Sequence, residues 1–301
     1  MIDGFMVLDA HVHAPRWDTL PPAWKEWART FGENVPLDEL YTPGGELDPH
    51  RFDSYMEAEG VDMALLFCEY SPRVTGIQPY EHLLPLVKHN PFRFRFVANV
   101  NPYLHYPVER WVQEQLAAGA VALKVHPVHG DFPANARELY PAYALCEHLG
   151  VPVIVHTGTS IFPGAANAFA DPSFLQDVVR DFPDLKVVLA HGGRGWWYGV
   201  AATMALDIPN VWIEISGLPP HKLGLYYDGF PFEELARKFI FGSDWPGVPS
   251  IRDNVRSILE LGLGRETIEA ILHRNALQIY RLQASRHSGL SGESSPGAAH
   301  D

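Results

Sequence analysis

Six side chains of metal-binding or acid–base type stand at the ends of apolar segments that lie far apart in the 301-residue chain. The first group is Asp9-Ala-His11-Val-His13, which follows an apolar run at residues 6–8. Positions i, i+2 and i+4 of a strand point to the same face, so this spacing predicts one shared face for all three residues. Two imidazoles at this spacing can bind one divalent metal ion. Taken alone, the pair is a weak signal, and two unrelated polar residues at a strand end explain it better than a metal site does.

Three later apolar segments end in a residue of the same kind. His156 follows Val-Ile-Val, His191 follows Val-Leu-Ala, and Asp244 follows Phe-Gly-Ser. In a closed barrel of parallel strands, the carboxyl ends of all strands meet at one mouth. Four such coincidences in chain order therefore predict a joint metal site rather than separate polar residues.

Short apolar runs typical of strands alternate with amphipathic stretches typical of helices. The strands are predicted at residues 6–9, 63–67, 94–99, 120–125, 153–156, 186–190, 211–215 and 239–242, and the helices at 49–59, 80–89, 107–118, 137–149, 172–181, 199–205, 231–237, 252–261 and 266–282. Nearly continuous apolar strands indicate a parallel sheet covered on both faces. We predict one α/β domain over residues 1–283, a TIM-type (β/α)8 barrel. The alternative, an open doubly wound sheet, more often carries a glycine-rich loop after its first strand.

Two stretches depart from this alternation. Residues 14–47 form a long insertion after the first predicted strand and contain Trp17, Trp24 and Trp27. This loop is predicted either to cover the mouth of the barrel or to pack its own tryptophans at the surface. Residues 284–301 are rich in Gly, Ser and Ala and are predicted to be a disordered tail.

The charge balance excludes several classes of partner. The chain has 23 Lys and Arg against 36 Asp and Glu, a formal net charge of −13. This balance disfavours binding to nucleic acid and to anionic membranes. There is no apolar run of about 18 residues and no basic region at the start, so we expect a cytoplasmic protein. Cys68 and Cys146, both in apolar surroundings, are expected to be reduced core residues.

At this point the sequence resembles the amidohydrolase superfamily, in particular the amidohydrolase-related branch that includes aminocarboxymuconate-semialdehyde decarboxylase and related hydrolases and carboxy-lyases. The motifs that carry the resemblance are Asp9-Ala-His11-Val-His13, His156-Thr-Gly, Ala-His191-Gly-Gly, Gly-Ser-Asp244-Trp-Pro, Asn275-Ala-Leu-Gln-Ile-Tyr280 and Asn135-Ala-Arg-Glu-Leu-Tyr-Pro-Ala-Tyr143. The resemblance covers about residues 6–282. It is specific for the fold and the metal site, and poorly specific for the substrate.

The resemblance implies a set of metal ligands. His11, His13, His156 and Asp244 would bind one metal ion, and Asp244 would also transfer protons. His191 would be a catalytic residue beside the ion, where it orients a water molecule or polarises the substrate. Three nitrogens and one carboxylate, with a position left for water, suit Zn²⁺ and also accept Mn²⁺. We expect one ion per chain.

Lys124 raises an alternative to this arrangement. It ends the fourth predicted strand. In some members of the superfamily that bind two metals, a lysine at this strand is carboxylated and bridges them, with a histidine such as His191 as a further ligand. The resembling decarboxylases lack this lysine, so its presence favours hydrolysis. An uncharged or paired lysine that binds a substrate carboxylate is the other interpretation.

Four further residues are predicted to surround the metal. Arg194 can bind an acidic group through bidentate contacts, or it is a surface residue. Trp245 directly follows Asp244 and is expected in the pocket wall. His126 lies on the same strand face as the lysine, where it contacts substrate or makes a core hydrogen bond. Asp9 is expected to orient a ligand histidine or to bind the metal itself.

The predicted function is metal-dependent hydrolysis of a small organic molecule that is carboxylated or is a lactone or an amide. Non-oxidative decarboxylation of an aromatic or muconate-type acid is the close alternative, because the same ligands serve both reactions. A barrel that binds a metal or ligand without catalysis is a third alternative, disfavoured by the acid–base residues Asp244 and His191. The resemblance also implies a homodimer.

Overall fold

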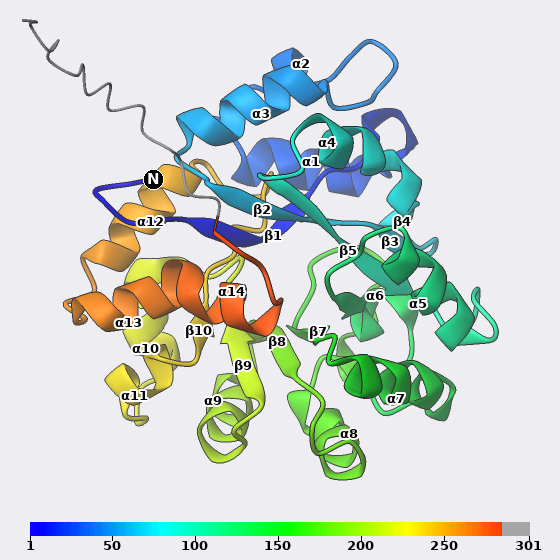
Figure 1. Cartoon of the computed structure of the whole chain (residues 1–301), viewed down its shortest axis with the longest axis vertical. Helices are drawn as coiled ribbons and strands as arrows, with labels where there is room; N and C mark the ends of the chain where they lie inside the picture. Colours follow the sequence, from blue (N-terminus) through cyan, green and yellow to red (C-terminus); the bar gives the residue numbers. More distant parts are fainter. Residues whose placement is uncertain (285–301) are drawn as a thin grey trace, which may run out of the picture.

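Eight parallel strands form a barrel in the computed structural model, which describes residues 1–284 (Figure 1). In order around the sheet, the strands are β1 (Leu8–His13), β2 (Met63–Phe67), β5 (Phe94–Val100), β6 (Leu123–Val125), β7 (Val153–Gly158), β8 (Val187–Arg194), β9 (Val211–Glu214) and β10 (Phe239–Ile240). All eight predicted strands are present, and the TIM-type barrel is confirmed. The predicted tail lies outside the described residues except for its first residue, Ala284.

The barrel closes between its first strand and the segment that follows β10. The Ala10 N–H donates to the carbonyl of Phe241 at 3.0 Å, and the His13 N–H donates to the carbonyl of Trp245 at 2.9 Å. The Asp244 N–H donates to the carbonyl of His11 at 3.0 Å. Closure therefore holds two segments that lie far apart in the sequence, the one with His11 and His13 and the one with Asp244, directly against each other.

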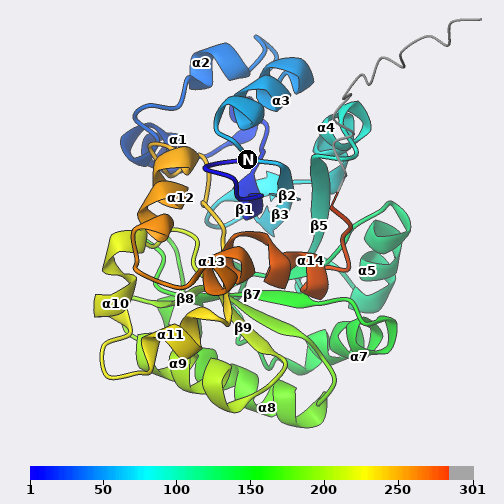
Figure 2. The ribbon, with the colours of Figure 1, turned by 60° about the vertical axis from the view of Figure 1, so that its left-hand side comes forward.

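Helices surround the barrel on all sides. They are α1 (Pro22–Phe31), α2 (Leu37–Leu40), α3 (Pro49–Ala58), α4 (Leu84–His89), α5 (Val108–Ala117), α6 (Pro127–Gly130), α7 (Tyr140–Leu149), α8 (Leu175–Asp181), α9 (Tyr198–Asp207), α10 (Leu223–Tyr226), α11 (Phe232–Ala236), α12 (Ile251–Leu259), α13 (Arg265–Glu269) and α14 (Asn275–Ile279). Figures 1 and 2 place α1, α2 and α3 together on one side of the molecule, and α7, α8 and α9 on the opposite side. Within the described residues, no helix combines the length and the apolar character that a membrane span requires.

The strands pack against two apolar clusters, one on each face of the sheet, which explains why their sequences are nearly continuous apolar runs. The inner cluster fills the barrel with side chains such as Leu65, Ile154 and Val188. It continues into Ile279 and Tyr280, so α14 covers the barrel end at which the strands begin. The outer cluster lies between the strands and the helices. Cys68 and Cys146 are buried and unpaired, as predicted.

Residues 69–78 and 266–282 depart from the predicted pattern. Residues 69–78 form an antiparallel hairpin of β3 (Glu69–Ser71) and β4 (Gly76–Gln78), although no strand was predicted there. The single helix predicted at 266–282 is three consecutive segments, because a π-helical turn at Ala270–Arg274 separates α13 from α14. The hairpin matters for function, since it brings Glu69 to the barrel mouth.

Candidate metal centre

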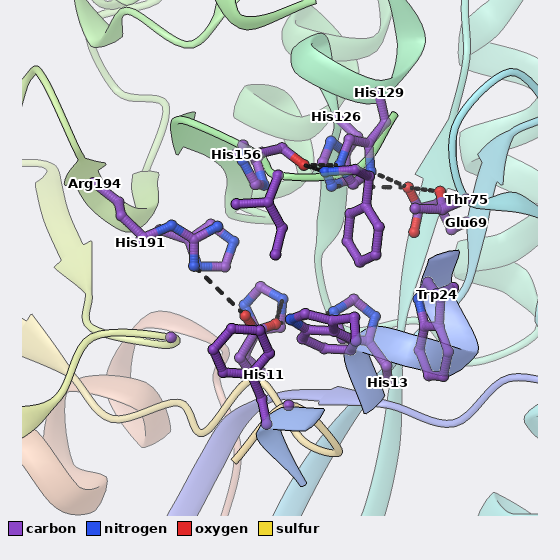
Figure 3. Close-up of a pocket in the computed structure, with 18 residues that line it drawn as sticks. His11, His13, Trp24, Glu69, Thr75, His126, His129, His156, His191 and Arg194 are labelled. Atoms are coloured by element: carbon purple, nitrogen blue, oxygen red, sulfur yellow. Dashed lines mark hydrogen bonds and ion pairs between the residues drawn. The ribbon is translucent and has the colours of Figure 1, made fainter. Parts of the chain in front are cut away.

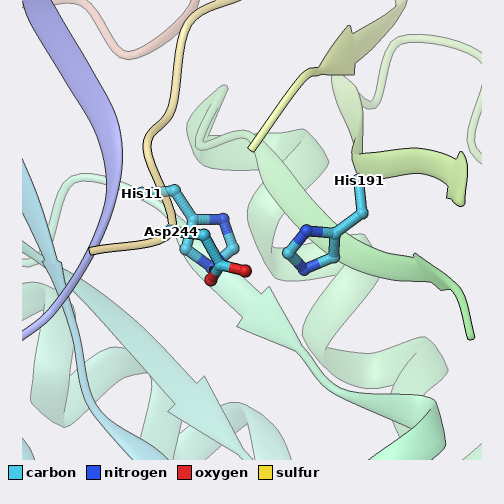
Figure 4. A group of neighbouring side chains, drawn as sticks. All are labelled: His11, His191 and Asp244. Atoms are coloured by element: carbon cyan, nitrogen blue, oxygen red, sulfur yellow. Dashed lines mark ion pairs between the residues drawn. The ribbon is translucent and has the colours of Figure 1, made fainter. Parts of the chain in front are cut away.

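His11, His13 and Asp244 meet where the barrel closes. The Asp244 carboxylate accepts a hydrogen bond from Nε2 of His13 at 3.1 Å, and Nε2 of His11 lies 3.6 Å from the same oxygen. His191 reaches this group from β8, and Figure 4 shows its ring facing His11 and Asp244. The donor atoms of His11, His191 and Asp244 all lie within 4.8 Å of one another.

Hydrogen bonds on the far side of two imidazoles orient them toward this group. Nδ1 of His11 contacts both carboxylate oxygens of Glu214, at 2.8 and 3.0 Å. Nδ1 of His191 donates to the carbonyl of Ser216 at 3.0 Å. In each ring this leaves Nε2 available to a ligand. Carboxylates and carbonyls commonly orient metal-binding histidines by such a hydrogen bond to the other ring nitrogen. Neither Glu214 nor Ser216 was predicted from the sequence.

The pKa values of these groups suit metal binding at neutral pH. Burial lowers the pKa of His11, His156 and His191 well below the usual histidine range, so these imidazoles are neutral. Burial alone would raise the pKa of Asp244, but the hydrogen bond from His13 and the positive charge of Arg194 oppose this effect, and the pKa is lowered. Neutral nitrogens beside an ionised carboxylate are the donor set that Zn²⁺ and Mn²⁺ accept. The residues therefore fit a divalent ion.

His156 lines the same pocket but stands apart from the tight group. Its ring centroid is 4.4 Å from that of His191 and 4.3 Å from that of His126. Its Nε2 donates to the carbonyl of Gly158 at 3.1 Å, and its buried Nδ1 has no hydrogen-bond partner among residues 1–284. The structure thus places His191 closer to His11 and Asp244 than the predicted ligand His156.

The backbone is left-handed at two candidate site residues. The φ angle is 64° at His191 and 69° at Asp244, in a region of backbone conformation that residues other than glycine rarely adopt. Such conformations persist where the surrounding structure enforces them, and they concentrate at functional sites. At Asp244 the enforcing contacts are its N–H bond to His11 and the ion pair with His13.

Trp245 does not form the pocket wall, contrary to the prediction. Its side chain is fully buried in the outer cluster, 5.0 Å from the ring of Phe52, and its indole N–H donates to the Tyr55 hydroxyl at 3.3 Å. Asp244 turns its own side chain into the pocket, and the next residue along the chain consequently faces the surrounding helices.

Asp9 also lies off the predicted face. Its carboxylate accepts hydrogen bonds from the N–H groups of His11 at 3.1 Å and Ser243 at 2.8 Å. Because Leu8 and Ala10 belong to the inner cluster, Asp9 between them points outward, and a register shift after Asp9 lets His11 point inward. Asp9 thus fixes the backbone of a ligand candidate without lining the pocket.

Lys124 is buried on the inner face of β6, beneath the pocket. Its ammonium lies 4.9 Å from the ring centroid of Phe67 and has no hydrogen-bond partner among the described residues. Burial lowers the pKa of Lys124 to about 8 and raises the pKa of Glu214 to about 7, and each charge partly offsets the shift of the other.

A cavity of about 220 Å³ opens above these groups, below the roughly 300–1,000 Å³ of sites for drug-sized ligands, so its size favours a smaller molecule. Its outer wall comes from the long insertion, which contributes Trp24, Trp27 and Phe31 of α1. Trp27 packs against Phe162 with ring centroids 5.5 Å apart. Of the two interpretations of residues 14–47, the structure supports the one in which they cover the mouth.

Arg194 lines the cavity, as predicted. Its guanidinium donates to the carbonyl of Thr159 at 3.1 and 3.3 Å, and Nη1 lies 3.8 Å from Asp244. The neighbouring indole of Trp196 is 75% exposed and faces away from the cavity. Arg194 is therefore the cationic group that a substrate in this cavity would meet near Asp244.

The wall across the cavity from His11 and His13 holds a second polar group (Figure 3). Nδ1 of His129 contacts Glu69 at 2.8 Å, and Nε2 of His129 contacts the Ser160 hydroxyl at 2.9 Å. The ring of His126 stacks on that of His129 with centroids 3.7 Å apart. Burial raises the pKa of Glu69, but the charge and hydrogen bond of His129 outweigh it and lower the pKa to about 2.

His126 was predicted here, whereas Glu69 and His129 were not. The His126-Pro-Val-His129 spacing, at the start of a helix after a strand, is the signal that could have identified His129. Glu69 had no comparable signal, because its position depends on the unpredicted hairpin.

Comparisons with known proteins agree with the barrel fold. The sequence profile of the family described as Amidohydrolase matches residues 8–282. No curated protein is similar enough in sequence to match the chain. Among solved structures, an uncharacterized TIM-barrel protein from Bordetella bronchiseptica is 23% identical, with 92% of this chain and 99% of that chain covered and a TM-score of 0.73.

Two further solved structures have similar barrels. One is a probable 2-pyrone-4,6-dicarboxylic acid hydrolase from Acinetobacter baumannii with citric acid bound (18% identity, 92% and 99% covered, TM-score 0.63). The other is a 5-carboxyvanillate decarboxylase from Novosphingobium aromaticivorans with bound manganese (13% identity, 93% and 98% covered, TM-score 0.64). At these identities the likeness concerns the fold alone.

Proposed function

This chain belongs to the amidohydrolase family of metal-dependent enzymes, and on that premise we propose that it hydrolyses a small carboxylated substrate, a lactone or an amide. The observation that carries the proposal is the orientation of His11 and His191. Glu214 and Ser216 hold their Nδ1 atoms, so both Nε2 atoms are left for a ligand beside Asp244.

We propose that His11, His13 and Asp244 hold one divalent ion, with His156 as the fourth ligand and His191 beside it. His156 supports this assignment through its unpartnered Nδ1. Zinc suits three nitrogens and one carboxylate best, and manganese is the alternative. When bound, the ion would act as a Lewis acid and lower the pKa of a water molecule.

Asp244 is placed to move protons. Its carboxylate is ionised near neutral pH, so it has a free oxygen that can accept a proton from the attacking water and pass it to the leaving group. His191 is placed to stabilise the charge that develops on the substrate oxygen. Arg194 offers a cation to a substrate carboxylate at the same end of the cavity.

Decarboxylation in the same site is the second candidate, favoured by the proximity of Arg194 to Asp244 at 3.8 Å. A substrate carboxylate bound by Arg194 would lie next to Asp244. Once protonated, Asp244 could protonate the carbon that loses CO₂. The alternative of a barrel without catalysis has no support, because the family consists of enzymes and the acid–base groups are present.

A direct assay separates the two reactions. The purified protein is incubated with a panel of lactones, amides and aromatic acids in ¹⁸O-labelled water, and products are identified by mass spectrometry. We expect the label to enter a new carboxylate, and we expect Asp244→Asn to lower kcat by about 10²- to 10⁴-fold at saturating metal. Release of CO₂ together with an organic product that carries no label would exclude hydrolysis.

A further inference from the structure

We propose that Glu69, His126 and His129 form a second site for a divalent cation of the Zn²⁺ or Mn²⁺ class, on the cavity wall opposite the first centre. The proposal goes beyond the function proposed above, because the ligands proposed for the first centre include none of these residues. All three are buried, and all three line the cavity.

The three side chains present their donor atoms at the separations that a metal site requires. Oε1 of Glu69 lies 2.8 Å from Nδ1 of His129 and 3.8 Å from Nε2 of His126. All three donors lie within 4.8 Å of one another. In a tetrahedral site with bonds of about 2.1 Å, neighbouring donors are roughly 3.4 Å apart. The two measured separations lie on either side of that value.

His126 provides an independent indication of a missing partner. It is only 6% exposed, and its Nδ1 has no hydrogen-bond partner among residues 1–284. Its Nε2 faces Glu69 at a distance too long for a hydrogen bond. A buried polar group without a partner is destabilising, and a cation could bind Nε2 without displacing a hydrogen bond between that atom and Glu69.

Neighbouring hydroxyl groups hold the other two ligands in place. The Thr75 hydroxyl donates to Oε1 of Glu69 at 2.6 Å, and the Ser160 hydroxyl contacts Nε2 of His129 at 2.9 Å. Such contacts orient metal ligands in the same way that Glu214 orients His11. Two histidines and one glutamate leave one position open toward the cavity, the arrangement of a site that also binds water or substrate.

The ring of His156, the proposed fourth ligand of the first centre, lies between His126 of this group and His191. Its ring stacks against His126 at 4.3 Å on one side and contacts His191 at 4.4 Å on the other. The second site is therefore distinct from a bridged pair built on Lys124, which lies under the cavity and contributes none of the three donors.

Metal content tests the proposal without an assay of turnover. The metal-free protein is loaded with excess Zn²⁺, freed of unbound metal by gel filtration, and analysed by plasma mass spectrometry; loading with Co²⁺ gives visible absorption bands as a second readout. We expect two ions per chain in the wild type. We expect one ion in His126→Gln, which loses a ligand that makes no hydrogen bond and should therefore fold normally.

Matched variants distinguish the two sites and the alternatives. Lys124→Met should keep both ions. Glu81→Gln, which removes an exposed carboxylate outside both sites, is the control and should also keep both ions. His11→Gln should lose the ion of the first centre and keep the second. A wild type that binds no more than one ion, or a second ion that is lost in Lys124→Met but retained in His126→Gln, would overturn the proposal while leaving the proposed hydrolysis intact.

Discussion

Glu214 is the residue that most directly prepares the first centre for a metal. It is fully buried, and both of its oxygens contact Nδ1 of His11. We predict that Glu214→Gln binds Zn²⁺ about 10- to 100-fold more weakly, because the neutral amide orients and polarises His11 less well. Competition with a chromogenic chelator measures the affinity.

The variant Glu233→Gln on α11 provides a control, since Glu233 is exposed and far from the centre in the fold. An unchanged zinc affinity in Glu214→Gln, with the fold intact by circular dichroism, would show that His11 needs no such partner.

The ligand candidates could be predicted from the sequence, whereas Glu214 and Ser216, which orient two of the imidazole rings, could not. His11, His13, His156, His191 and Asp244 each follow an apolar strand, and the topology of a parallel barrel brings them to one mouth. Glu214 also ends a strand, but Ile215 and Ser216 follow it without a motif. Trp245 was misplaced because the left-handed backbone at Asp244 reverses the direction that the side chains would otherwise take.

The long insertion acts at the scale of an element, since α1 forms the outer wall of the cavity. Trp27 contacts both His13, with ring centroids 6.3 Å apart, and Phe162. We predict that Trp27→Ala raises KM about tenfold and lowers kcat less, because it removes a wall that binds substrate and spares the groups that move protons.

Steady-state kinetics on the substrate identified in the labelling assay measure this split. Trp17→Ala, in the same insertion but outside the cavity lining, is the matched control. An effect on kcat alone would mean that Trp27 serves the chemistry rather than binding.

The loop after β5 contains a buried histidine with a predictable effect of pH. His105 accepts a hydrogen bond from the Asn101 N–H at 3.2 Å and packs between Tyr70 and Trp111, and burial lowers its pKa below the usual value of 6.5. Below pH 6.5 the unfolded chain binds a proton at this histidine that the folded chain does not. This contribution to stability is therefore present above pH 6.5 and is lost as the pH falls toward the lower folded pKa.

Urea unfolding of the metal-free protein between pH 7.5 and 5.5 checks the sign. As the pH falls, we predict that the free energy of unfolding declines less steeply in His105→Asn than in the wild type. The difference in slope is at most about 1.4 kcal/mol per pH unit. His148→Asn, a substitution of an exposed histidine, should leave the slope as it is in the wild type. A steeper decline in His105→Asn would contradict the interpretation.

The strands were predictable because burial on both faces makes each of them a nearly continuous apolar run. The hairpin of β3 and β4 was not, since its strands have three residues each and carry the polar residues Glu69, Ser71 and Gln78. The covering position of α1 was left open, because periodicity shows that a helix is amphipathic but not what it packs against.

At the scale of the whole molecule, a metal at the barrel closure links the first and last strands. A ligand that binds only the folded state stabilises it by about 2.7 kcal/mol at a concentration one hundred times Kd. We predict that removing the metal with a chelator lowers Tm and that adding Zn²⁺ restores it. Calorimetry measures the change, and identical melting curves with and without metal would refute a structural contribution of the ion.

The homodimer implied by the resemblance stays a prediction at this scale. Light scattering on the purified protein would give its mass in solution, and a mass of one chain would refute it. The cytoplasmic location likewise stays a prediction.

The central claim is that separated strand ends gather around one metal ion, and anomalous diffraction at the zinc absorption edge tests it most directly. For crystals of the zinc-loaded protein, we predict a peak bonded at about 2.0–2.2 Å to Nε2 of His11 and to a carboxylate oxygen of Asp244. A well-ordered crystal of the loaded protein with no peak between these two residues would contradict the account.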